Sequence, residues 1–183
     1  MRNKKVLFIT QSAAIAALYV VLTLLANALG LANYAIQVRF SEALTILPYF
    51  TPSAIPGLFV GCIVSNILTG CHPIDTVFGS LATLVGAIIT YLVAHGFKMP
   101  GSEGYRCKST LRKWLCPIPP IVANIIVVPQ VIRYCYGSED SVSFLMLTVG
   151  AGEIISCMIL GMILLYALES RNVGNKIFGT SNN

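Results

Sequence analysis

Residues 39–62 read RFSEALTILPYFTPSAIPGLFVGC, and this stretch decides how the chain divides into segments. It leads into an uncharged run, residues 43–74, that is too long for one membrane helix and too short for two. Pro48, Pro52 and Pro56 interrupt the run, and proline breaks the hydrogen-bonding pattern inside a helix. The expected elements are a short helix over residues 41–50, a tight turn, and a longer helix over residues 55–70.

Long apolar segments make up most of the rest of the chain. A bilayer core about 30 Å thick is crossed by roughly 20 apolar residues of helix, and the flanking runs approach or exceed that length. The sequence therefore predicts an all-α integral membrane protein in which residues 1–183 form one domain, a six-transmembrane-helix bundle with a short second helix. The six segments are residues 6–29, 41–50, 55–70, 75–97, 115–132 and 142–168.

The composition excludes several other classes of protein. Of the 183 residues, 56% are hydrophobic and 10% are charged, whereas typical globular domains have roughly 45–50% and about 25%. A soluble domain of this size needs more polar residues to cover its surface. A soluble monomer, a disordered chain and an ordinary nucleic-acid-binding protein are therefore excluded.

The distribution of basic residues predicts the orientation in the bilayer. With six crossings and a cytoplasmic N-terminus, all 12 Lys and Arg residues except Arg39 and Arg133 fall on the inside, which satisfies the positive-inside rule. Both termini are then cytoplasmic. The polar stretch at residues 98–115 is expected to be a cytoplasmic linker, and the basic N-terminus to precede a transmembrane helix rather than a secretion signal.

Two polar residues inside apolar segments are candidate binding residues. Glu153 lies in the last segment, where a carboxylate costs at least ~2.5–3.5 kcal/mol unless it is solvated or paired. We expect it to face a cavity that opens to the outside. Asn124 can donate and accept hydrogen bonds, so it suits a base-like or amide-like ligand, although an interhelical hydrogen bond explains it equally well.

Further candidates lie at segment ends. Arg39 and Glu42 are spaced three apart, which fits a ligand site, a local ion pair or a capping arrangement with Ser41. Asp75 is expected to cap the helix that it begins, because an anion is favoured at a helix N-terminus. An external loop carries polar and aromatic residues that could close over a ligand, namely Asn33, Tyr34 and Gln37.

The sequence contains no recognisable pattern for catalysis, metal binding or ATP hydrolysis. The six cysteines form no C-x-x-C pair, and His72 and His95 have no ligand cluster around them, so neither a metal site nor a disulfide framework is expected. Walker and hydrolase motifs are absent, so the chain is predicted not to be an enzyme and to need no cofactor. The residues indicate a small membrane protein that binds a polar ligand from outside.

Small residues predict where helices pack closely. Ser12 and Ala16, and likewise Ala13 and Ala17, are small pairs at a spacing of four in the first segment. Such pairs pack either inside a protein or against another protein, and the sequence alone leaves both open. Two other stripes are expected to pack internally: Gly57, Gly61, Ser65 and Thr69, and Gly79, Thr83 and Ala87.

Three stretches carry a resemblance to one family. Residues 39–62, residues 75–84 (DTVFGSLATL) and residues 150–157 (GAGEIISC) are similar to the QueT family, and the resemblance covers nearly the whole chain apart from residues 98–115. It implies a substrate-binding (S) component of an energy-coupling factor (ECF) transporter in a bacterial cell membrane. The implied substrate is a queuosine precursor captured from outside: 7-cyano- or 7-aminomethyl-7-deazaguanine, queuine or queuosine.

The resemblance also implies partners. An S component works in the lipid bilayer with a transmembrane coupling protein and two cytoplasmic ATPase subunits, which agrees with the missing ATPase motif. Ala13 and Ala17 match the patch by which the first helix docks on the coupling protein, so docking is favoured for this pair. The alternatives are an S component for another vitamin or nucleobase and a non-transport scaffold subunit.

The implied ligand suggests roles for the candidate residues. A guanine-like edge presents an N–H and an amino group side by side, which one carboxylate can accept together, and we expect Glu153 to do so. Asn124 or Gln37 would meet the carbonyl group. The rings that could stack on the ligand are Phe78, Tyr34 and Phe40, and the carboxylates that could pair with an exocyclic amine are Glu42 and Asp75.

Overall fold

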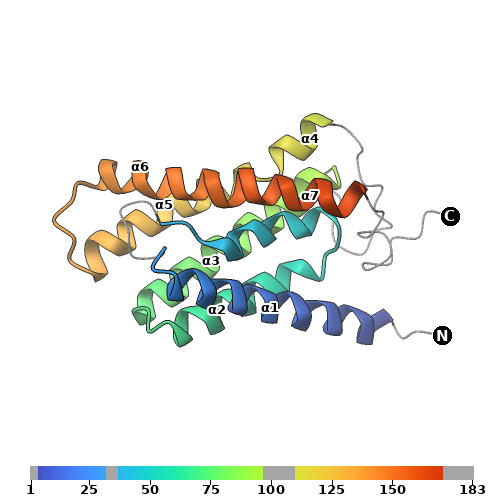
Figure 1. The fold of residues 1–183 in the computed structure, drawn as a ribbon, viewed down its shortest axis with the longest axis horizontal. Coiled ribbons are helices and arrows are strands. Elements are labelled where there is room, and N and C mark those ends of the chain that lie inside the picture. The colour runs from blue at the N-terminus through green and yellow to red at the C-terminus, as the bar shows by residue number, and fades with distance from the viewer. Residues whose placement is uncertain (1–3, 32–36, 97–109, 171–183) are drawn as a thin grey trace.

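The computed structural model describes residues 4–31, 37–96 and 110–170, and these ranges contain helices and no strand. The long helices lie side by side along one axis (Figure 1), and the first turn of α1 and the last turn of α7 lie at the same end of the bundle. In chain order the elements are α1 (Lys4–Ala28), η1 (Phe40–Tyr49), α2 (Ala54–Leu68), α3 (Pro73–Ala94), α4 (Thr110–Leu115), α5 (Ile118–Cys135), α6 (Val142–Glu153), η2 (Ile154–Leu160) and α7 (Gly161–Ser170).

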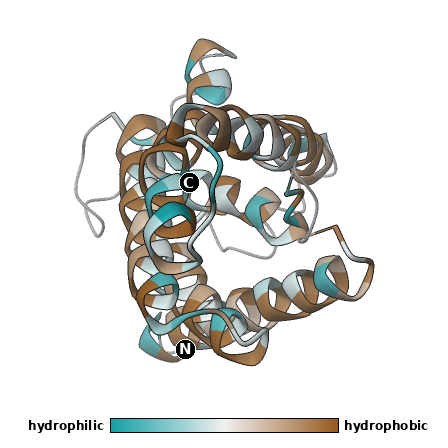
Figure 2. Ribbon diagram, turned by 90° about the vertical axis from the view of Figure 1, so that its left-hand side faces the viewer, coloured by the Kyte–Doolittle hydropathy of each residue, from teal (hydrophilic) through white to brown (hydrophobic). Residues whose placement is uncertain are grey.

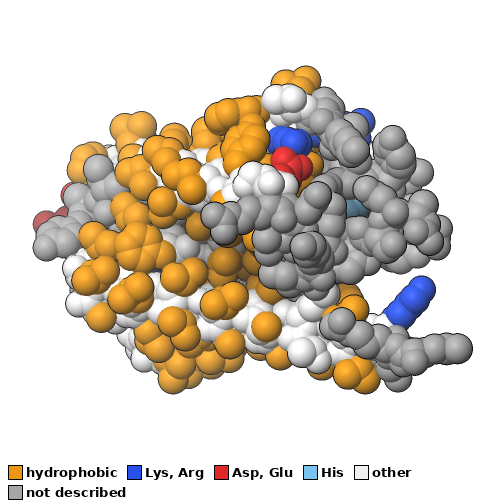
Figure 3. All heavy atoms as spheres, turned by 45° about the vertical axis from the view of Figure 1, so that its right-hand side comes forward, with side chains coloured by type: hydrophobic (Ala, Val, Ile, Leu, Met, Phe, Trp, Pro, Cys, Tyr) orange, Lys and Arg blue, Asp and Glu red, His pale blue; other side chains and the backbone are white. Residues whose placement is uncertain are grey.

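Four helical stretches are long and apolar enough to cross a membrane: Lys4–Ala28, Pro73–Ala94, Thr110–Cys135 and Val142–Ser170. Hydrophobic residues make up most of the helical ribbon (Figure 2) and cover most of the described surface in Figure 3. An apolar surface of this extent is unfavourable in water and compatible with lipid. The prediction of an all-α, membrane-type protein is confirmed at this level. The other two predicted segments form shorter helices, α2 with 15 residues and η1 with 10.

The stretch that contains Pro48 forms a short helix, and this helix lies in the core. η1 has 3-10 geometry, and its residues Ile46, Leu47 and Tyr49 are buried. It contacts α1, α3, α7 and η2, which enclose it. Because 3-10 helices of this length are uncommon, packing from several sides supports η1 more than local preference does.

Small residues bring α1 and α2 together. A Cβ atom on Gly57 would lie 2.8 Å from the Ser12 carbonyl oxygen, and one on Gly61 would lie 2.8 Å from Tyr19 Cβ and 3.1 Å from Ala16 Cα. A larger side chain at either glycine would therefore force the helices apart. The predicted internal packing of this stripe is confirmed for its two glycines, and Ser12 and Ala16 lie on the side of α1 that faces them.

The expected linker over residues 98–115 is partly wrong, because its last residues form α4. Lys113 of α4 places its Nζ atom 2.6 Å from Glu169 Oε2 on α7. Both side chains are largely buried, so this ion pair joins α4 to the end of the last helix. The rest of the linker, residues 98–109, lies outside the described residues.

Candidate functional site

A cavity of about 430 Å³ lies where α1, α2 and α5 end and α3 begins. This volume is within the usual range for small-molecule sites, roughly 300–1,000 Å³. The wall combines one basic and one acidic residue with amide, hydroxyl and apolar side chains. Its polar part includes Gln37, Arg39, Asn66, Thr69, Asp75 and Tyr136, and its apolar part includes Val128 and Ile132.

Arg39 provides the positive charge of the cavity. Its backbone N–H donates a hydrogen bond of 3.1 Å to Ser156 Oγ, which ties the segment before η1 to η2. The guanidinium interacts electrostatically with the carboxylates of Glu42, Asp75 and Glu153. It makes no hydrogen bond or short ion pair with any residue in the described ranges, so the local pair with Glu42 is not formed. Its N–H groups are therefore available to a ligand.

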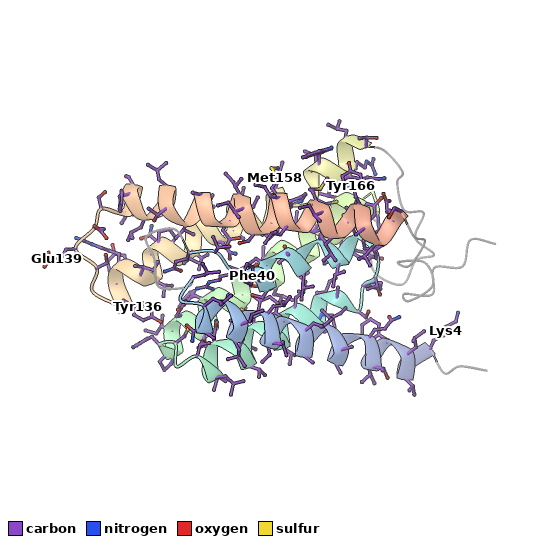
Figure 4. The ribbon with its side chains drawn as sticks, viewed as in Figure 1. Lys4, Phe40, Tyr136, Glu139, Met158 and Tyr166 are labelled. Atoms are coloured by element: carbon purple, nitrogen blue, oxygen red, sulfur yellow. The ribbon has the colours of Figure 1, made fainter. Side chains whose placement is uncertain are left out.

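Asp75 provides the negative charge, from the first turn of α3. It was expected to cap this helix, but the cap is His72, whose Nδ1 accepts a hydrogen bond of 3.3 Å from the Ile74 amide. Asp75 Oδ2 instead accepts a hydrogen bond of 2.9 Å from the hydroxyl of Tyr136, just after α5 (Figure 4). Burial, followed by the neighbouring Asp75 charge, raises the pKa of Tyr136 to about 12, so the phenol stays protonated at neutral pH.

Gly152 allows the segment before η1 to pass close to α6. A Cβ atom on Gly152 would collide with the backbone of Gln37. Any larger residue would displace the segment that brings Gln37 and Arg39 into the cavity wall, because packed backbone cannot give way as a side chain can. Gly152 on α6 therefore helps to position two cavity residues, Gln37 and Arg39, that belong to the neighbouring segment.

Glu42, Glu153 and Cys157 form a second polar group, the buried acid cluster, whose ligand atoms all lie within 4.8 Å of one another. The hydroxyl of Tyr19 donates to Glu42 Oε1 at 2.5 Å. Asn124 Nδ2 donates to Glu153 Oε1 at 3.0 Å, and Cys157 Sγ donates to Glu153 Oε2 at 3.2 Å. The cluster lies inside the bundle, and none of its three members lines the cavity.

The structure therefore separates the candidate polar residues into two groups. Gln37, Arg39 and Asp75 line the cavity. Glu153 does not, and both of its oxygens are hydrogen-bonded to neighbouring side chains, which corrects the expectation that it faces an outward cavity unpaired. Asn124 joins α5 to α6 through Glu153, so the interhelical alternative holds for it.

The two candidate aromatic residues that the structure describes, Phe78 and Phe40, do not lie where they could stack on a ligand in the cavity. Phe78 is 51% exposed on α3 and Phe40 begins η1 (Figure 4), and neither lines the cavity. Asn33 and Tyr34 lie outside the described residues. Among the aromatic residues in the described ranges, Tyr136 lines the cavity.

Asn66 and Tyr136 also line the cavity, and neither was predicted from the sequence. Asn66 is an amide within the apolar helix α2 and is buried, which is the same signal that singled out Asn124. Tyr136 carries no comparable signal, because its partner Asp75 is 61 residues away in the chain. A contact across that separation is visible only in the folded structure.

Comparison with known proteins agrees with the resemblance seen in the sequence. A match to the QueT transporter family covers residues 9–170. The chain is similar to the queuosine precursor transporter QueT of Lactococcus lactis subsp. cremoris (strain MG1363), with 34% identity over 98 residues. This match spans 54% of the chain and 57% of the relative's length. No solved structure gives a significant match. Because the family match covers most of the chain, from within α1 to the end of α7, the chain belongs to the QueT transporter family.

Proposed function

We propose that this protein binds a queuosine precursor, a 7-deazaguanine, in the cavity between Arg39 and Asp75 and delivers it for uptake. The observation that carries the proposal is that the guanidinium of Arg39, which has no hydrogen-bond partner in the described ranges, lines a cavity of small-molecule size together with the carboxylate of Asp75. Family membership and the printed function of the relative support the same substrate class.

Asp75 suits the guanine-like edge of such a ligand. A carboxylate accepts the ring N–H and the neighbouring amino group together. One Asp75 oxygen is bound by Tyr136, and that hydrogen bond orients the carboxylate in the cavity wall. Glu153 is the residue expected from the sequence to have this role, but it lies outside the cavity wall and its oxygens are already hydrogen-bonded.

The opposite edge of the ligand carries a carbonyl group that needs hydrogen-bond donors. Arg39 offers its guanidinium, and Gln37 and Asn66 offer amide N–H groups from the same wall. Val128 and Ile132 provide an apolar surface for the flat ring. This arrangement distinguishes a guanine-like base from an apolar ligand of the same size.

We further propose that the chain is an S component with six crossings and cytoplasmic termini in a bacterial cell membrane. Ala13 and Ala17 are exposed on α1, whereas the adjacent Ser12 and Ala16 face α2. An exposed pair of small residues fits docking on a transmembrane coupling protein, with ATP hydrolysis supplied by two separate ATPase subunits.

Thermal unfolding with a ligand panel tests the substrate. The panel contains 7-cyano- and 7-aminomethyl-7-deazaguanine, queuine, queuosine, guanine, riboflavin and thiamine. A ligand at about 100 times its Kd adds about 2.7 kcal/mol to the free energy of unfolding. We expect stabilisation by deazaguanines only. Stabilisation by riboflavin or thiamine instead, or by no compound, would refute the proposed substrate, and the second result would favour a scaffold subunit.

A further inference from the structure

The buried acid cluster brings together donor atoms from two separate parts of the chain. Glu42 belongs to η1, whereas Glu153 ends α6 and Cys157 follows in η2. Their ligand atoms all lie within 4.8 Å of one another. Glu42 and Cys157 are each 1% exposed and Glu153 is 6% exposed. The cluster is therefore a compact set of donors inside the protein.

An unpaired carboxylate oxygen in this cluster points to a bound cation. Glu42 Oε1 accepts a hydrogen bond from Tyr19, but Oε2 is buried and has no hydrogen-bond partner in the part of the chain that the structure describes. A charged oxygen of this kind is strongly unfavourable unless a cation binds it or a proton neutralises the carboxylate. A second carboxylate, Glu153, lies beside it and adds repulsion. Arg39 interacts with both, but its charge is shared with Asp75.

The donor atoms indicate the class of cation. Thiolate sulfur with carboxylate oxygens suits zinc and similar divalent transition metals, whereas Mg²⁺ and Ca²⁺ prefer oxygen ligands alone. We propose that Glu42, Glu153 and Cys157 bind one divalent transition-metal ion of the zinc class. The Cys157 thiol releases its proton to solvent when it binds the ion.

Neighbouring groups support such a site. Metal-bound side chains are usually oriented by hydrogen bonds from a surrounding layer of residues, and Tyr19 and Asn124 donate such bonds to Glu42 and Glu153. A divalent ion would offset two of the three negative charges of the carboxylates and the thiolate, and Arg39 would offset part of the third. The ion would join η1 to the last long helix and thereby hold the segment that lines the cavity.

Cobalt(II) tests the site, because a cobalt–thiolate bond produces a charge-transfer absorption band that carboxylate ligands alone do not. The full-length protein, purified in detergent and treated with a chelator, is titrated with Co²⁺ and then with Zn²⁺. We expect the band to appear at one ion per chain and to disappear as zinc displaces cobalt. Cys157→Ser should abolish the band, and Glu42→Gln should weaken cobalt binding at least ~10-fold.

Two further variants keep the test decisive. Cys116→Ser changes another fully buried cysteine, outside the cluster, and should leave the band intact. Tyr19→Phe retains the ring and removes one orienting hydrogen bond, so it should weaken cobalt binding ~10-fold or more even if Cys157→Ser does not fold.

Two results would overturn the proposal: no cobalt–thiolate band in the unaltered protein, or a band that persists in Cys157→Ser. In the first case the two carboxylates share a proton instead of a metal ion. These measurements use the metal alone, so their outcome is independent of whether the protein binds a deazaguanine.

Discussion

The hydroxyl of Tyr136 lies 2.9 Å from Asp75 Oδ2 and joins the end of α5 to the first turn of α3 at the wall of the cavity. The backbone N–H of His72 donates a second hydrogen bond, of 3.0 Å, to the same hydroxyl oxygen. The phenol thus receives one hydrogen bond and donates another. This relationship orients the only acidic side chain among the cavity-lining residues in the described ranges.

Removing the charge of Asp75 should weaken ligand binding. Asp75→Asn keeps the shape of the side chain but replaces one acceptor oxygen by a donor, so a hydrogen bond of about 1.5–3 kcal/mol to the ligand is lost. We expect the Kd for a deazaguanine, measured by calorimetry, to rise at least ~10-fold. Glu139→Gln changes an exposed carboxylate that points away from the bundle (Figure 4) and should leave the Kd unchanged. Equal affinities for all three proteins would exclude Asp75 from the site.

Tyr136→Phe should loosen the cavity wall in a pH-dependent way. The hydrogen bond from Tyr136 to Asp75 contributes about 0.5–1.5 kcal/mol to the free energy of unfolding, the usual net value for a hydrogen bond. We do not expect more, because Tyr136 is half exposed and water can replace the lost partner. The pKa of Tyr136 is raised to about 12 in the folded protein from about 10 in the unfolded chain. The stabilisation from this hydrogen bond is therefore complete below pH ~10, and it is lost as the pH rises through ~12 and the phenol loses its proton.

The melting temperatures of the unaltered protein and Tyr136→Phe, measured from neutral to alkaline pH, check this expectation. The difference between them should be constant up to pH ~10 and should then shrink. A difference that shrinks already near neutral pH would show that another group titrates.

Gly152→Ala should destabilise the protein and weaken ligand binding together. The added methyl group collides with the Gln37 backbone, and overpacking of this kind costs about 1–3 kcal/mol. Gly150→Ala on the same helix is the control, because its methyl group would meet the Ile125 side chain, which can move. Thermal unfolding should show a clearly larger loss for Gly152→Ala, and similar losses for both variants would contradict the proposed close approach.

Neighbouring alanines on α1 should respond differently to enlargement. Ala17→Leu changes an exposed position, so folding and ligand binding should persist while copurification with a coupling protein is lost. Ala16→Leu changes a position 3.1 Å from where a Cβ atom on Gly61 would lie, so it should lower the melting temperature. If Ala17→Leu copurifies normally, the exposed pair is not the docking surface.

The helical segments could be predicted from the sequence because their cause is local. Uncharged runs must satisfy their backbone hydrogen bonds internally when lipid surrounds them, and helix formation does so. A helix accordingly lies over each of the six apolar runs, and a break follows η1 near Pro52. The helix α4 was missed because its six residues, which include Arg112 and Lys113, read as polar linker, and its contact with Glu169 is remote in sequence.

The polar residues of the two sites were recognised by type, but their grouping was not. Glu153 and Asn124 stood out because amides and carboxylates are rare in apolar segments. Their partners could not be read from the chain: Asn124 bonds Glu153 across 29 positions, and Cys157 lies beside Glu42 across 115. For the same reason no metal cluster was expected from the histidines, whereas the fold gathers two glutamates and a cysteine.

The sequence by itself determined that this chain forms apolar helices, where they break, and which family it belongs to. Those properties follow from composition, proline positions and contiguous motifs, all of which act over short distances along the chain. Only the tertiary structure decided that Asp75 lines the cavity with Arg39 while Glu153 is bound inside the bundle. That choice depends on how α3, α5 and α6 pack around η1, because helix packing sets which neighbour each polar side chain meets.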